Sequence, residues 1–202
     1  MSTTSSKTYK ILLFTSLALT ICALAFYAWL FNIKKSVPLP ILGKVGAFEL
    51  SDSNGKSFAQ GQLDGKVWVA NFIFTTCAGP CPIMTRNLAS IYRSYLLERN
   101  VHFVSFTVNP QYDSPSVLTE YAKAQKADTS RWHFLTGTPE TLNRLAIDDF
   151  KIGSKENLIN HSTFFALVDG EFNIRGYYDG TLDAGVKKLF QDISRLMKES
   201  RK

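Results

Sequence analysis

Two cysteines separated by three residues dominate the chemistry that this sequence offers. Cys77 and Cys81 lie in the run FTTCAGPCP, residues 74–82. The run follows an apolar segment of strand length and opens an amphipathic stretch, so we expect the pair at a strand–helix junction, where open α/β sheets place their sites. Because Pro82 suits the first helical position, we expect Cys81 to cap the helix, where the helix dipole favours its thiolate form.

A thiolate is both a nucleophile and a metal ligand, so the pair alone does not choose between redox work and metal binding. Redox dithiols on such folds usually enclose two residues, whereas this pair encloses three. The longer loop favours two sulfurs turned toward one metal ion, although it does not forbid a disulfide. Two thiolates and an imidazole suit copper, and zinc would accept them with a fourth ligand. A structural disulfide or two buried thiols are the alternatives without a functional role.

Three histidines are candidates for a third ligand. His161 lies in a polar turn before an expected strand, and loops at strand ends carry function more often than strand interiors do. His102 and His133 sit among apolar residues, which favours ordinary edge or surface positions. Met84 offers a thioether one turn beyond Cys81, but its place in an apolar stripe favours core packing. The residues alone leave the choice open, with His161 the strongest candidate.

The segments around these residues alternate between strand and helix patterns. A continuous apolar run over 66–74 predicts a strand buried on both faces, and the three- and four-residue apolar spacing after Pro82 predicts a helix. Asp169-Gly170 predicts a hairpin between the last two strands. We also expect a β-hairpin within 43–65, strands at 101–108, 133–135, 163–168 and 172–178, and helices at 116–127, 138–150 and about 186–197. This order predicts an α/β thioredoxin-like fold, a central mixed sheet flanked by helices with an N-terminal hairpin extension.

An apolar segment without a charge, residues 11–31, precedes these elements. As a helix its 21 residues span about 31 Å, the thickness of a hydrocarbon core. Ala23-Leu24-Ala25 resembles a signal-peptide cleavage site, but the apolar run continues six residues past it. A lipoprotein signal does not fit, because Ile21 precedes Cys22 where a small residue is expected. We therefore expect one uncleaved transmembrane helix, with Cys22 as an apolar filler.

The net charge of +6 belongs largely to the flanks of this segment. Residues 1–35 hold four lysines and no acid, and the rest of the chain holds 19 basic and 17 acidic residues. The charge is therefore no indication of nucleic-acid binding. The expected layout is a short cytoplasmic N-terminus at 1–10, a transmembrane anchor at 11–31, a proline-containing tether at 32–42 and a thioredoxin-like domain at 43–202.

Several motifs occur in order along the chain. They are FIFTTC at 72–77, Cys81-Pro82, VSF at 104–106 and on through Pro110, Asp113-Ser114-Pro115, WHFLTG at 132–137 and His161-Ser162. In this combination the chain resembles the Sco/SenC family of copper-binding proteins. The matches run from about residue 43 to residue 178, nearly the whole soluble part, and the combination is specific, although no single motif is.

The resemblance implies that Cys77, Cys81 and His161 bind copper, as Cu(I), Cu(II) or both. It also implies a role in assembling the dinuclear copper centre of cytochrome c oxidase subunit II. The protein would act as a chaperone that hands over copper without turnover or, alternatively, as a thiol-disulfide oxidoreductase that reduces that subunit's cysteines. An upstream copper carrier or thiol reductant is a further expected partner.

The expected location is a bacterial inner membrane, with the C-terminal domain in the periplasm, because cytosolic glutathione would keep the dithiol reduced and compete for copper. A mitochondrial inner membrane facing the intermembrane space is the alternative. One position departs from the family: Asn109-Pro110 stands where Asp-Pro is usual. The preference between Cu(I) and Cu(II) is therefore left open, with Asp113 as the acid that could substitute.

Overall fold

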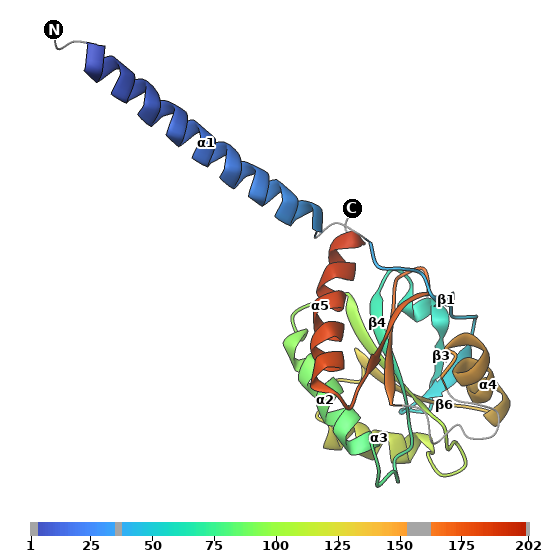
Figure 1. Cartoon of the computed structure of the whole chain (residues 1–202). Coiled ribbons are helices and arrows are strands. Elements are labelled where there is room, and N and C mark those ends of the chain that lie inside the picture. The colour runs from blue at the N-terminus through green and yellow to red at the C-terminus, as the bar shows by residue number, and fades with distance from the viewer. Residues whose placement is uncertain (1–3, 35–37, 153–162, 201–202) are drawn as a thin grey trace. The chain divides into compact units, whose positions relative to one another are not determined.

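The computed structural model describes residues 4–34, 38–152 and 163–200 (Figure 1). The chain divides into two compact units, Met1–Pro38 and Leu39–Lys202. In the first, helix α1 (Thr4–Lys34) contains an apolar stretch, Leu12–Trp29, that is long enough to cross a membrane. Length and composition of this kind fit an anchor and a signal sequence alike.

The second unit is built on a mixed sheet of eight strands within the described residues, ordered β1-β8-β7-β4-β5-β6-β2-β3. The strands are β1 (Gly43–Lys44), β2 (Glu49–Asp52), β3 (Ser57–Ala59), β4 (Val67–Ile73), β5 (Val101–Thr107), β6 (Trp132–Thr136), β7 (Phe164–Val168) and β8 (Asn173–Asp179). The helices are η1 (Gln60–Leu63), α2 (Cys81–Ser94), α3 (Pro115–Ala124), α4 (Pro139–Asn143), η2 (Arg144–Asp149) and α5 (Asp183–Glu199). This is the thioredoxin-like arrangement that the sequence predicts, and β2 and β3 form the predicted hairpin.

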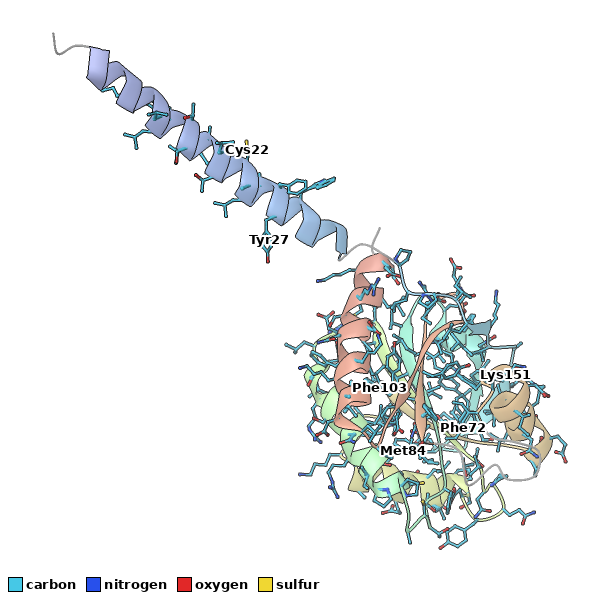
Figure 2. All side chains as sticks on the ribbon, in the orientation of Figure 1. Cys22, Tyr27, Phe72, Met84, Phe103 and Lys151 are labelled. Carbon is cyan, nitrogen blue, oxygen red and sulfur yellow. The ribbon has the colours of Figure 1, made fainter. Side chains whose placement is uncertain are left out.

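Parallel strands β4, β5 and β6 form the centre of the sheet. Every residue of β4 and β5 is buried, which confirms the expectation from their continuous apolar runs. Phe103 and Met84 belong to the core beneath α2, α3 and α5, whereas Phe72 belongs to the core beneath the hairpin, α4 and η2 (Figure 2). Helices therefore cover both faces of the sheet and leave the ends of the strands for the connecting loops.

Two helical segments differ from the sequence prediction by more than their terminal residues. Helix α3 begins at Pro115 and ends at Ala124, before residue 127, because Lys126 adopts a left-handed backbone conformation with φ 55°. The helix expected over 138–150 divides into α4 and the π-helix η2, since the Phe150 amide bonds the Leu145 carbonyl five residues back. Side-chain patterns do not distinguish this hydrogen-bond shift from a continuous α-helix.

His102 and His133 form a pair across neighbouring strands and are not the edge or surface residues that the sequence suggested. The His102 Nδ1 and His133 Nε2 atoms are 3.1 Å apart, and the ring planes differ by 9°. The pKa of each histidine is lowered to about 4, chiefly by burial, with the Lys66 charge contributing at His102 and the neighbouring His102 contributing at His133. Both rings are therefore neutral at pH 7, one donating to the other.

This pair should make stability depend on pH. An unfolded histidine has a pKa near 6.5, so between about pH 4 and 6.5 the unfolded chain binds more protons than the folded one. We expect the free energy of unfolding, from urea titrations, to fall between pH 7 and 5 by on the order of 2 kcal/mol for each ring. His133→Phe should lose less over that interval, and a wild type equally stable at both pH values would contradict the assignment.

Candidate metal centre

The cysteine pair lies at the junction of β4 and α2, as the sequence predicts, with Cys77 in the connecting loop and Cys81 at the start of the helix. The Cys77 amide donates to the Phe74 carbonyl at 3.2 Å, which closes a turn after the strand. The helix itself begins at Cys81, with Pro80 as its N-cap residue in helical geometry and Pro82 one position inside. The expectation that Cys81 would be the cap is therefore wrong by one residue, because Pro80 already has helical dihedral angles.

The thiols of Cys77 and Cys81 are hydrogen-bonded to each other, and both cysteines are free in this structure. Cys77 is half-buried, whereas the exposed fraction of Cys81 is 5%. Burial raises the pKa of the Cys81 thiol to about 12, and a hydrogen bond with Cys77 adds to the rise. The expected thiolate at the helix terminus is therefore not present at Cys81, because desolvation of the charged sulfur outweighs the helix dipole.

A buried carboxylate holds the loop that carries the cysteines. Asp113 has no exposed surface and follows β5. It accepts hydrogen bonds from the Thr75 amide at 3.3 Å, from the Thr75 hydroxyl at 2.5 Å and from the Thr107 hydroxyl at 2.5 Å. Asp113 therefore ties the start of the cysteine loop to the end of the neighbouring strand. In this structure it acts on the site through Thr75, a residue that the sequence analysis did not single out.

Asn109 belongs to the turn between β5 and Asp113. Its amide donates to the Thr107 hydroxyl at 2.9 Å, and its carbonyl accepts from the Asp113 amide at 2.9 Å. Both contacts use backbone atoms of Asn109, so they would be the same with an aspartate at this position.

The third predicted ligand, His161, lies outside the described residues. The described chain resumes at Thr163, whose carbonyl accepts from the Gly180 amide at 2.7 Å, and the Gly180 carbonyl accepts from Asn87 of α2 at 2.8 Å. Strand β7 runs antiparallel to β4, so it enters the sheet at the edge where the cysteine loop leaves it. Thr163 is thus fixed beside α2, two residues after His161.

Cys77 and Cys81 supply two sulfur donors, the kind of ligand that soft metal ions prefer. Within residues 4–34, 38–152 and 163–200, no group of three or more His, Cys, Asp or Glu side chains is arranged to hold a metal ion. The other histidines are bonded to each other, and Met84 is buried in the core as expected. The described residues therefore present two of the three predicted donors.

Removal of the Asp113 charge should loosen the cysteine loop. In Asp113→Asn an amide NH₂ replaces one acceptor oxygen that faces N–H and O–H donors, so we expect the free energy of unfolding to fall by about 2 kcal/mol. Hydrogen exchange of the Thr75 amide should also accelerate. Asp148→Asn, the same change at an exposed position, should shift stability by less than about 0.5 kcal/mol. Equal effects of the two substitutions would show that Asp113 does not hold the loop.

The sequence and the fold of this chain match those of a known protein family. The sequence model of the SCO1/SenC family matches residues 42–198. A SCO1/SenC family lipoprotein from Bacillus anthracis superposes with a TM-score of 0.71 at 32% identity, covering 80% of this chain and 99% of that one. BsSco, described as a member of the Sco family of cytochrome c oxidase assembly proteins with a disulfide switch, gives 0.70 at 27% identity, covering 79% and 98%.

Yeast Sco1 with copper bound superposes with a TM-score of 0.60 at 28% identity, covering 77% of this chain and 90% of that one. The family match spans most of the second compact unit, including the cysteine loop, Asp113 and the strand that follows His161. The chain therefore belongs to the SCO1/SenC family.

Proposed function

We propose that this protein is a membrane-anchored copper chaperone for assembly of the dinuclear copper centre of cytochrome c oxidase subunit II. The observation that carries the proposal is the neighbouring pair of thiols at the end of β4 in a chain of the SCO1/SenC family. Copper bound to yeast Sco1, and the oxidase-assembly role stated for BsSco, support the metal and the pathway.

Cys77, Cys81 and His161 are the proposed ligands. Two sulfurs and one imidazole form a soft donor set that suits copper. The antiparallel entry of β7 and the anchoring of Thr163 beside α2 support His161, because two residues reach about 7 Å at most. Asp113 orients the cysteine loop. Copper is the cargo in this proposal: the protein receives it from an upstream carrier and passes it on to the oxidase subunit.

Loss of His161 should weaken copper binding without unfolding the protein. In an anaerobic titration of the reduced full chain in detergent, we expect one Cu(I) per chain, with an affinity that drops about 100-fold or more in His161→Ala. His133→Phe, which removes a histidine outside the proposed site, serves as the control and should bind copper as the wild type does. Equal affinity of wild type and His161→Ala would exclude His161 from the site.

A thiol-disulfide oxidoreductase that reduces the oxidase subunit's cysteines is the second candidate. The hydrogen bond between Cys77 and Cys81 favours it, since the sulfurs lie close together, and BsSco is described as having a disulfide switch. Both functions need the two cysteines, but only copper delivery needs the histidine. Reductase turnover that survives in His161→Ala would therefore favour this second function.

The proposed location is a bacterial inner membrane, with residues 1–10 in the cytoplasm and the C-terminal domain in the periplasm. The apolar stretch of α1 supports an anchor, and a dithiol that handles copper avoids competition with cytosolic glutathione outside the cytoplasm. A reporter that is active only outside the cytoplasm, fused after Lys202, should therefore be active in cells. A cytoplasm-specific reporter at the same junction should be silent, and the reverse pattern would overturn this topology.

A further inference from the structure

A groove of about 450 Å³ extends from the cysteine pair along the space between α2 and α3. Arg86, Ala89 and Arg93 line it from α2, and Ala124 and Lys126 line it from the end of α3. The small side chains of the two alanines leave room between the helices. The sequence analysis did not find this groove, because its two walls come from separate segments of the chain, residues 81–93 and 121–126.

The groove is basic along its length. Three cations line it, and none of its lining residues among those described is acidic. Neither Arg86 nor Arg93 makes a hydrogen bond or an ion pair with the part of the chain that the structure describes. Arg144 and Arg175, by contrast, pair with aspartates at 2.8 and 2.9 Å. The groove arginines therefore keep their charge available to a ligand.

Lys126 adds its charge at a position that favours glycine. It follows the last turn of α3 with φ 55°, where the amides of Lys126 and Ala127 bond back to the Lys123 and Ala122 carbonyls. Glycine is the usual residue in this helix-ending conformation because it has no Cβ. A lysine here is less favourable for the backbone than glycine would be, and its side chain lines the groove.

The length of the groove fits a short extended peptide. Cys81 and Arg93 are twelve residues apart on α2, which corresponds to about 18 Å along the helix axis. An extended chain of about five residues spans that distance. The hydroxyls of Thr85 and Tyr121 are 2.9 Å apart and fasten α2 to α3 along the groove. The groove is therefore framed by two connected helices and has the thiols at one end.

We propose that this groove binds an extended acidic segment of the partner polypeptide whose cysteines meet Cys77 and Cys81. The proposal rests on the proposed function, because copper or thiol exchange requires the partner's sulfur atoms at this end of the groove. Carboxylates of the segment pair with Arg86, Arg93 and Lys126. A concave groove between two helices suits a single extended chain better than a flat membrane surface.

The test uses the full chain in nanodiscs of uncharged lipid and two labelled hexapeptides, one with five glutamates and a serine, the other with five glutamines and a serine. Fluorescence anisotropy at low salt should give at least about tenfold tighter binding of the glutamate peptide, and the difference should shrink at high salt. The double variant Arg86→Glu, Arg93→Glu should lose this preference. The control Lys187→Glu, Lys198→Glu makes the same charge change at exposed positions of α5 and should retain it.

A second pair of variants separates docking from folding. Lys126→Gly removes a groove charge and relieves the left-handed backbone, so its Tm should equal or exceed that of the wild type while peptide binding weakens. Lys151→Gly makes the same change beside α4, also at a left-handed position with φ 53°, and should bind the peptide normally (Figure 2).

Equal losses in groove and control variants, or no preference for the glutamate peptide, would overturn the proposal. The proposal would also be overturned if the wild type bound phosphatidylserine vesicles but not the glutamate peptide, and if the double variant Arg86→Glu, Arg93→Glu lost the vesicle binding. That result would assign the groove to a membrane surface. Cu(I) titration of the wild type keeps the two ideas apart. A wild type that binds copper but shows no preference for the glutamate peptide refutes the groove alone, and a wild type that does not bind copper refutes the proposed function.

Discussion

The buried carboxylate of Asp113 is the interaction on which the geometry of the site depends. Its hydrogen bonds join Thr75, which lies two residues before Cys77 in the loop after β4, to Thr107 at the end of β5. A carboxylate without exposed surface is stable only when donors surround it, so the two loops are held in one relative position. The cysteine loop lies beyond the end of β4 and takes no part in the hydrogen bonds between the described strands of the sheet. The contacts with Asp113 therefore fix its position instead.

The sheet explains why these parts meet at one edge. Strands β4 and β5 are parallel, so the cysteine loop and the turn that contains Asp113 both follow carboxyl ends of neighbouring strands. Strand β7 is antiparallel to β4, so Thr163, the residue before β7, lies at that same edge. The mixed topology thus brings the start of β7 to the edge of the sheet where the cysteine loop leaves β4, through strand direction alone.

The sequence predicts features that local patterns determine and misses those that depend on distant residues. Seven consecutive buried positions in β4, and the hairpin at Asp169-Gly170, follow from apolar continuity and turn chemistry. The His102–His133 pair depends instead on the register of β5 with β6, which places residues 31 positions apart side by side. The contact of Asp113 with Thr75 spans 38 positions and has no local pattern either.

The two cysteines have different environments, and this difference is relevant to both candidate functions. Burial raises the pKa of the Cys81 thiol, so at neutral pH this sulfur is protonated and weakly nucleophilic in the metal-free protein. Cys77 is the more exposed of the two and is therefore the more accessible sulfur. In the proposed copper site, the charge of the ion would offset the desolvation cost and favour both sulfurs as thiolates. The burial that keeps Cys81 protonated therefore also limits its reactivity as a thiol.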